Sequence, residues 1–90
     1  MYRVHLIISG DVQGVGYRMW TKNQTHELDL TGWVKNREDA AVEIVAEGGR
    51  GELEEFTKRC QHGPDVAMVE QVDVKWEEAS GEFMTFEVEY

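Results

Sequence analysis

The fold is predicted from a stretch near the start of the chain, Val4-His5-Leu6-Ile7-Ile8-Ser9-Gly10-Asp11-Val12-Gln13-Gly14-Val15-Gly16-Tyr17-Arg18. Val4, Leu6 and Ile8 alternate with neighbours of the opposite face, which is the pattern of a strand with one buried face. Ile7 is apolar on the other face, so we expect this strand to be central in its sheet. The glycines that follow allow a tight turn. A strand, a glycine-rich turn and a helix are therefore expected here.

Downstream, the pattern first predicts a helix and then a hairpin. The helix runs from the glycine turn to about Leu28, with its inward face formed at helical spacing by Tyr17, Thr21, Thr25 and Leu28 and with Trp20 alongside. Residues 31–36 and 42–47 are then expected to be extended, because apolar residues alternate there. Arg37-Glu38-Asp39 between them has the composition of a turn.

After the glycine cluster of residues 48–51, a second helix is predicted by an apolar stripe at positions i, i+3, i+4 and i+7: Leu53, Phe56, Thr57 and Cys60. His62-Gly63-Pro64 ends this helix. Alternation predicts a strand from Met68 to about residue 77 and a terminal strand over residues 86–90. Trp20, Trp33 and Trp76 fall at helical or alternating positions, so we expect them to pack in the core.

This order of elements, βαββαβ plus a terminal strand, defines the fold class. It is an α+β fold with the ferredoxin-like split βαβ arrangement, in which two helices pack on one face of an antiparallel sheet. The first two strands of such a sheet run parallel with the third between them, so they end at the same edge. Arg18 follows one of these ends and Asn36 marks the other. Two strand spacings of about 9.5 Å in total leave room for a phosphate-sized anion between them.

Gly14-Val15-Gly16-Tyr17-Arg18 is the candidate anion-binding segment. Glycines let consecutive backbone N–H groups approach a ligand, and the start of a helix adds unpaired N–H groups and the positive end of its dipole. The planar guanidinium of Arg18 suits phosphate or carboxylate oxygens. An ordinary strand-to-helix turn with a surface arginine remains the alternative from these residues alone.

Composition limits the classes of partner. A chain of 90 residues with 41% hydrophobic residues is expected to form a single domain, residues 1–90. Eighteen acidic and nine basic residues give a formal charge of −9, which opposes binding to nucleic acid. No segment predicts a membrane span or a signal peptide. Cys60 is the only cysteine, so no internal disulfide forms and a cytoplasmic protein is expected.

Other phosphate and cofactor chemistries fit the sequence poorly. A phosphocysteine mechanism needs an arginine six residues after the cysteine, but Val66 stands six after Cys60, whose place on an apolar stripe predicts a core residue. Met19 stands where a dinucleotide fingerprint needs its third glycine. No Lys-Ser/Thr pair follows Gly16, as a P-loop requires. The three histidines are scattered, so no metal and no cofactor is expected.

Four segments of the chain form a recognisable set: residues 10–18 (Gly-Asp-Val-Gln-Gly-Val-Gly-Tyr-Arg), residues 31–36 (Thr-Gly-Trp-Val-Lys-Asn), residues 42–48 (Val-Glu-Ile-Val-Ala-Glu-Gly), and Gly81-Glu82-Phe83 with Phe86. In these residues and in their order, the sequence resembles the acylphosphatase family of the small, stand-alone type over nearly its whole length. The resemblance implies a hydrolase that cleaves acyl phosphates to a carboxylate and inorganic phosphate, without metal or cofactor.

The resemblance also implies roles for individual residues. Arg18 is expected to bind phosphate and Asn36 to position the attacking water. The phosphate-binding loop would comprise Gln13, Gly14, Val15, Gly16, Tyr17 and Arg18. A small acyl phosphate is the expected substrate and a monomer the expected state. A catalytically inactive module of the same fold, which binds an anion or a partner, is the alternative.

Three residues depart from the family pattern. Asp11 places a negative charge beside the loop, where it is expected to weaken the affinity for phosphate. Asp29 replaces a frequent glycine after the first helix, at a position that often needs left-handed backbone geometry. Ala40 replaces a common glycine of the hairpin, so that turn is expected to differ in type. None of these changes affects Gly14, Gly16, Arg18 or Asn36, so we expect them to tune affinity and stability.

Overall fold

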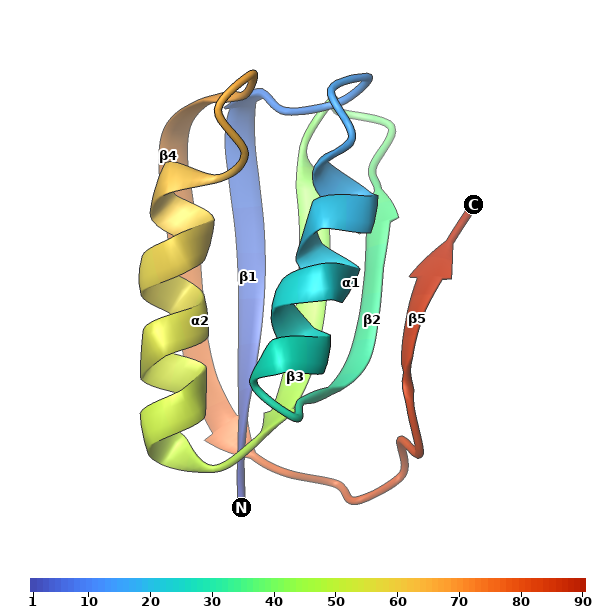
Figure 1. Cartoon of the computed structure of the whole chain (residues 1–90), viewed down its shortest axis with the longest axis vertical. Coiled ribbons are helices and arrows are strands. Elements are labelled where there is room, and N and C mark those ends of the chain that lie inside the picture. Colours follow the sequence, from blue (N-terminus) through green and yellow to red (C-terminus); the bar gives the residue numbers. More distant parts are fainter.

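Both helices lie on the same face of one five-stranded sheet (Figure 1). The computed structural model describes all residues, 1–90. In chain order the elements are β1 (Tyr2–Asp11), α1 (Tyr17–Glu27), β2 (Thr31–Asn36), β3 (Val42–Gly48), α2 (Arg50–His62), β4 (Met68–Glu78) and β5 (Phe86–Glu89). Neither helix combines the length and the apolar character needed to cross a membrane. The predicted order of elements and the ferredoxin-like fold are confirmed.

The strand order, β4-β1-β3-β2-β5, places the ends of β1 and β2 at one edge of the sheet. β3 lies between β1 and β2 and is antiparallel to both, so β1 and β2 run in the same direction. β1 is also paired with β4 and is therefore an internal strand, as the apolar Ile7 predicts. The loop after β1 and the turn after β2 come together at the top of the molecule in Figure 1.

The terminal strand changes the character of the sheet. β5 pairs with β2 in parallel, so the sheet is mixed, whereas we predicted an antiparallel one. The physical reason is the path of residues 79–85, which cross from the end of β4 to the opposite edge of the sheet (Figure 1). β5 then starts beside the start of β2 and runs in the same direction. The C-terminus therefore points toward the same end of the sheet as the carboxyl ends of β1 and β2.

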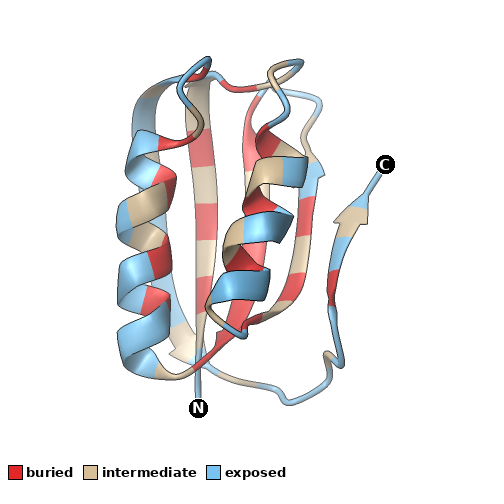
Figure 2. Cartoon of the chain, in the orientation of Figure 1, coloured by how far each residue is buried: buried red, intermediate tan, exposed pale blue.

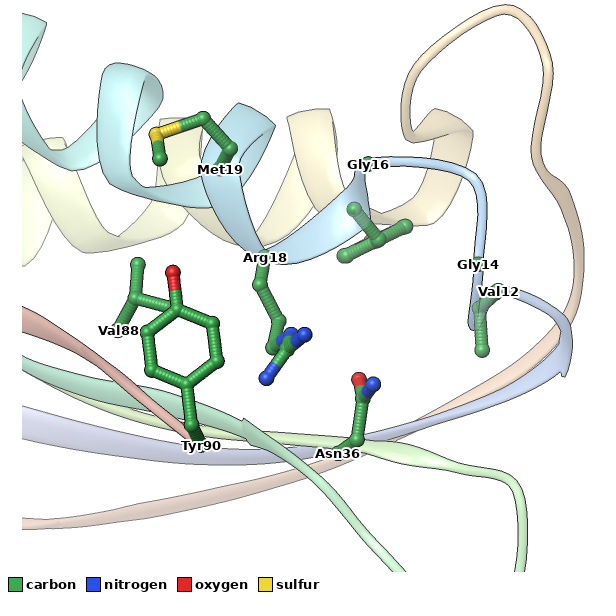
Figure 3. Close-up of a pocket in the computed structure, with 9 residues that line it drawn as sticks. Val12, Gly14, Gly16, Arg18, Met19, Asn36, Val88 and Tyr90 are labelled. Carbon is green, nitrogen blue, oxygen red and sulfur yellow. The ribbon is translucent and has the colours of Figure 1, made fainter.

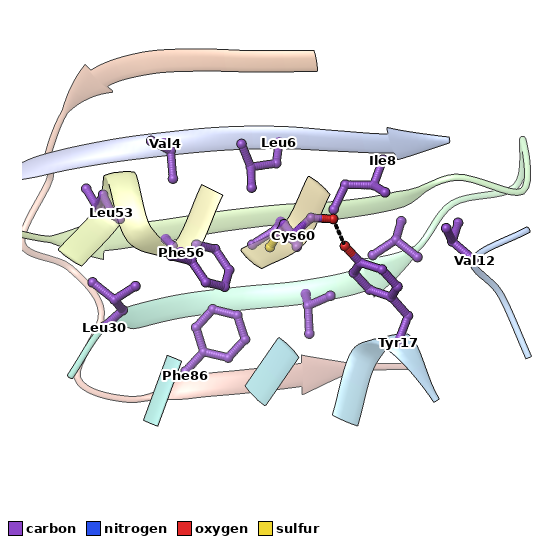
Figure 4. Close-up of a cluster of buried hydrophobic side chains, with 14 of the residues drawn as sticks. Val4, Leu6, Ile8, Val12, Tyr17, Leu30, Leu53, Phe56, Cys60 and Phe86 are labelled. Carbon is purple, nitrogen blue, oxygen red and sulfur yellow. Dashed lines mark hydrogen bonds between the residues drawn. The ribbon is translucent and has the colours of Figure 1, made fainter. Parts of the chain in front are cut away.

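The core lies between the sheet and the helices (Figures 2 and 4). Alternate side chains of the internal strands face the helices and are buried, among them Val4, Leu6, Ile8, Val34, Val42 and Ile44. The helices contribute Tyr17, Thr21 and Thr25 from α1 and Leu53, Phe56 and Cys60 from α2, as their spacing predicts. Phe86 of β5 closes the core at the far edge. This core holds α1, and with it the start of that helix, in a fixed place over the sheet.

The three tryptophans do not share one environment. Trp20 is half-buried and packs against the core, as predicted. The prediction is wrong for Trp76, which is 36% exposed and lies edge-on to Tyr2 at a centroid distance of 6.4 Å. β4 is an edge strand, so its side chains are covered on one side only. The prediction is also wrong for Trp33, which is half-buried and does not belong to the core cluster. The adjacent residue Val34 is buried beneath the helices, so Trp33 lies on the opposite face of the sheet.

Two residues hold the left-handed backbone geometry that glycine adopts most easily. Asp29 has φ of 57° directly after α1, so the prediction of left-handed geometry at this position is confirmed. Ala40 has φ of 72° in the turn between β2 and β3. The turn therefore keeps a left-handed residue even though alanine carries a Cβ atom, at a cost of about 1–2 kcal/mol relative to glycine.

We expect Ala40→Gly to stabilise the protein. The strain removed from the folded state outweighs the extra conformational entropy that glycine gives the unfolded chain. The free energy of unfolding should therefore rise by about 0.5–1 kcal/mol. Ala41→Gly is the matched control, because Ala41 is buried and is not left-handed, and it should lower stability. Urea unfolding followed by circular dichroism measures both. A lower midpoint for Ala40→Gly than for the native chain would show that the turn carries no strain.

Candidate active site

The loop between β1 and α1 is shaped by two left-handed glycines. Gly14 has φ of 77° and Gly16 has φ of 79°. A Cβ atom at either position would have no neighbouring atom within 4 Å, so the backbone conformation, and not lack of space, is what requires glycine there. Gly16 is also the residue that precedes the first turn of α1. The sequence thus curls the chain tightly just before a helix begins.

This curl leaves backbone donors without partners. No backbone carbonyl accepts a hydrogen bond from the N–H groups of Gly14, Val15 or Gly16. α1 then begins without a side-chain cap and without an acidic residue in its first turn. The N–H groups of a first helical turn have no acceptor within the helix, and they carry the positive end of its dipole. The loop and the helix start together form a set of donors suited to an anion.

Arg18, the second residue of α1, adds a fixed positive charge beside these donors. Its Nη1 donates to the carbonyl oxygen of Glu89 at 3.0 Å, and its guanidinium lies 4.6 Å from the ring centroid of Tyr90. Every other arginine of the chain lies within 4.0 Å of a carboxylate oxygen, in the pairs Arg3–Glu47, Arg37–Asp39, Arg50–Glu54 and Arg59–Glu55. Arg18 has no such partner, so most of its N–H donors remain available in a chain of charge −9.

Asn36 approaches from the sheet. It is the last residue of β2, pairs with Val42 of β3 and lies on the face that the helices cover. Its side-chain amide extends toward the guanidinium of Arg18 (Figure 3). The two side chains border a cavity of about 140 Å³, which is lined by Val12, Gly14, Gly16, Tyr17, Arg18, Met19, Asn36, Val88 and Tyr90. The structure therefore joins the loop, the arginine and the amide in one concavity.

The family model described as acylphosphatase matches residues 4–88. The chain belongs to the acylphosphatase family. It is 42% identical over 88 residues to an acylphosphatase of Pelotomaculum thermopropionicum, covering 98% of this chain and 96% of that relative. It is 46% identical over 81 residues to an acylphosphatase of Trichormus variabilis, covering 90% and 80%. The family that the sequence resembles is thus confirmed.

Solved structures of acylphosphatases share the whole fold. The crystal structure of acylphosphatase from Bacillus subtilis superposes with a TM-score of 0.96 at 33% identity and covers 100% of both chains. A full-length HypF structure in the phosphate- and nucleotide-bound form matches with a TM-score of 0.88 at 26% identity, and the match covers 100% of this chain but 12% of that one. The acylphosphatase fold therefore also occurs as part of a much longer protein.

Not every residue of the predicted phosphate loop lines this cavity. Gly14, Gly16, Tyr17, Arg18 and Asn36 line it, whereas Gln13 and Val15 do not. Val15 is half-buried and packs against the core. The side chain of Gln13 extends to the turn after β2. Val12, Met19, Val88 and Tyr90 line the cavity without having been predicted to do so.

The hydroxyl group of Tyr17 is engaged in a hydrogen bond within the core. The buried phenol donates to the carbonyl oxygen of Cys60 at 2.6 Å (Figure 4), and burial raises the pKa of Tyr17. Cys60 is fully buried on α2, and burial also raises the pKa of its thiol. A protonated thiol in the core cannot attack phosphorus. The prediction of Cys60 as a core residue is confirmed.

Apart from Arg18, the charged residues near the loop do not line the cavity. Asp11 is exposed at the end of β1, where it pairs with Met68 of β4, and it is absent from the cavity lining. Arg37 pairs with Asp39 in the turn after β2, and its guanidinium lowers the pKa of the Asp39 carboxyl group. No group of three or more His, Cys, Asp and Glu side chains is arranged to hold a metal ion. Arg18 is the one cationic side chain that lines the cavity.

Proposed function

We propose that this chain is a single-domain, metal-free acylphosphatase whose cavity binds the phosphate of its substrate between the Gly14–Arg18 segment and Asn36. Acylphosphatases hydrolyse acyl phosphates to a carboxylate and inorganic phosphate, which is the reaction of this family. The observation that carries the proposal is one juxtaposition. An arginine without a carboxylate partner and an asparagine amide face each other across a cavity that adjoins unpaired N–H groups.

Phosphate binding is assigned to the loop and to Arg18. The N–H groups of Gly14, Val15 and Gly16 and of the first turn of α1 are fixed donors, so they need no reorganisation as charge builds up on the phosphoryl oxygens. The guanidinium supplies two parallel donors to the same oxygens. Positioning and charge stabilisation are the main requirements of phosphoryl transfer. This set of groups supplies both.

Asn36 is assigned to the attacking water. A side-chain amide both donates and accepts hydrogen bonds, so it can hold a water molecule in line with the bond that breaks. It cannot take up the proton, and no side chain with a carboxylate, imidazole or thiol group lines the cavity. The proton of the water therefore passes to a phosphate oxygen. The carboxylate leaves without a proton of its own, so the reaction requires no general acid.

Met19, Val88 and Tyr90 give the cavity an apolar side beside Arg18 (Figure 3). Met19 is 53% exposed, so this side opens to solvent. We assign it to the acyl group of the substrate, whose carbon skeleton would contact these side chains while the phosphate faces the loop. Small acyl phosphates with an apolar acyl group, such as benzoyl phosphate, fit this arrangement.

The remaining parts of the proposal concern the state and place of the enzyme. The single cysteine is free and buried, which suits the reducing conditions of the cytoplasm. The edge strand β4 carries four acidic residues, Glu70, Asp73, Glu77 and Glu78, and one basic residue, Lys75. An excess of one charge along an edge opposes pairing with a second copy. We therefore assign a cytoplasmic monomer. The charge of −9 opposes nucleic acid as a partner.

Hydrolysis of benzoyl phosphate in the presence of excess EDTA tests the function. We expect the same turnover with and without the chelator and competitive inhibition by inorganic phosphate, because the donors that bind phosphate belong to the chain itself. Loss of activity in EDTA that Mg²⁺ or Mn²⁺ restores would show a metal-dependent reaction. Phosphate binding without any hydrolysis would favour the inactive module.

A further inference from the structure

We propose that Gln13 positions Asn36 through the turn between β2 and β3 and does not itself bind phosphate. This inference rests on the role proposed above for Asn36. Gln13 precedes Gly14, so the sequence groups it with the phosphate loop. Its side chain, however, does not line the cavity.

The amide of Gln13 bonds both ends of this turn. Its Nε2 donates to the carbonyl oxygen of Arg37 at 2.8 Å and to that of Ala41 at 2.9 Å. A carboxamide nitrogen has two N–H donors, so both are used. The carbonyl of Ala41 also accepts from the N–H of Arg37 at 2.8 Å. Gln13 therefore clamps the closed base of the turn to the loop that contains Gly14 and Gly16.

Asn36 needs such support because it stands where the strand pairing stops. It forms the last pair of β2 with Val42, and Arg37 is the next residue along the chain. The turn beyond it includes the left-handed Ala40, and the bond from the N–H of Ala40 to the carbonyl of Arg37 is long, at 3.3 Å. The Asn36 amide makes no side-chain hydrogen bond to the protein that would fix its own place, so its position follows that of the backbone.

The consequence is a link between two halves of the site that are distant in sequence. The loop of residues 14–18 holds the phosphate, and the turn follows Asn36, the residue that holds the water. Gln13 joins them with two hydrogen bonds, which sets the separation between phosphate and water. In-line attack is sensitive to errors of about 1 Å in such a separation. Loss of the clamp should therefore lower kcat and leave phosphate binding largely intact.

Gln13→Leu tests the inference, because leucine fills similar space and donates no hydrogen bond. We expect kcat for benzoyl phosphate to fall by about tenfold or more and the Kd for inorganic phosphate to change by less than about twofold. In an Asn36→Ala background the same replacement should change kcat by less than about twofold, because the residue through which Gln13 acts is gone. Gln71→Leu, an exposed glutamine on β4, is the matched control and should alter neither quantity.

Gln13→Glu adds a readout that a purely structural role would not move. An ionised glutamate has no proton to offer the two carbonyl oxygens, whereas a protonated one donates to one of them. The ratio of its kcat to that of the native enzyme should therefore rise as the pH falls from 7 to 5, toward the range in which a carboxyl group protonates. The pH dependence of Gln13→Glu also tests the inference if Gln13→Leu fails to fold.

Three results would overturn the inference. One is a loss of phosphate affinity in Gln13→Leu that matches its loss of kcat, which would place Gln13 in the phosphate site. Another is a full loss of kcat in the Asn36→Ala background, and the third is a pH-independent ratio for Gln13→Glu. None of these results touches the proposed function, which fails by a different result, namely phosphate binding by the native chain without any hydrolysis of benzoyl phosphate.

Discussion

Arg18→Lys should lose about two to three orders of magnitude in kcat/KM for benzoyl phosphate, the effect expected when a fixed donor is removed from a developing oxyanion. Lysine keeps the charge but replaces a planar pair of donors with a single point charge. It also loses the geometry in which Nη1 bonds the carbonyl of Glu89 while the guanidinium lies 4.6 Å from the Tyr90 ring centroid. Steady-state kinetics over a range of substrate concentrations measure the loss.

Arg59→Lys is the matched control for this variant. Arg59 lies on α2, and its guanidinium pairs with Glu55 and Glu27 outside the cavity. Its replacement should change kcat/KM by less than about twofold, because surface ion pairs of this kind contribute little. Both variants should keep the native circular dichroism spectrum. Near-normal turnover of Arg18→Lys would remove the guanidinium from the mechanism.

Asn36→Ala should lower kcat by about a hundredfold while inorganic phosphate still binds. The amide is assigned to the water and not to the phosphate, so its loss affects the transition state more than the bound ground state. Kinetics with benzoyl phosphate give kcat, and calorimetric titration gives the Kd for phosphate, which should stay within about twofold of the native value.

Asn23→Ala serves as the control for Asn36→Ala, since Asn23 is exposed on α1 and does not line the cavity. It should leave both kcat and phosphate binding unchanged. The contrary pattern at position 36, a weaker Kd for phosphate with turnover preserved, would assign Asn36 to the phosphate and leave the water without an orienting group.

Much of this site could be predicted because strand order fixes it. The alternation around Leu6 and the pattern after Gly32 predict two strands, and the split βαβ topology makes them parallel with a third strand between. Arg18 and Asn36 must then approach one another at the same edge, and the structure brings them to one cavity. The meeting of Arg18 and Asn36 can therefore be predicted from the periodicity of the sequence, its turn residues and the topology that they define.

The parts that could not be predicted depend on the path of connections and on side-chain conformation. Residues 79–85 have no periodic pattern, so the direction of β5 and the arrival of Tyr90 beside Arg18 have no signal in the chain. Gln13 is grouped with the loop by its neighbours, but its amide bonds carbonyl groups 24 and 28 residues away. Trp76 alternates like a core residue, yet it stands on an edge strand that the helices do not fully cover.

The most direct test of the central claim is a titration of the ¹⁵N-labelled enzyme with inorganic phosphate, followed by the backbone and side-chain N–H signals in NMR spectra. The claim is that phosphate binds between the loop of residues 14–18 and Asn36. It predicts that the largest changes occur at the N–H groups of Gly14, Val15 and Gly16, at Nε of Arg18 and at the side-chain amide of Asn36. Saturable phosphate binding that leaves these signals in place and shifts others would contradict it.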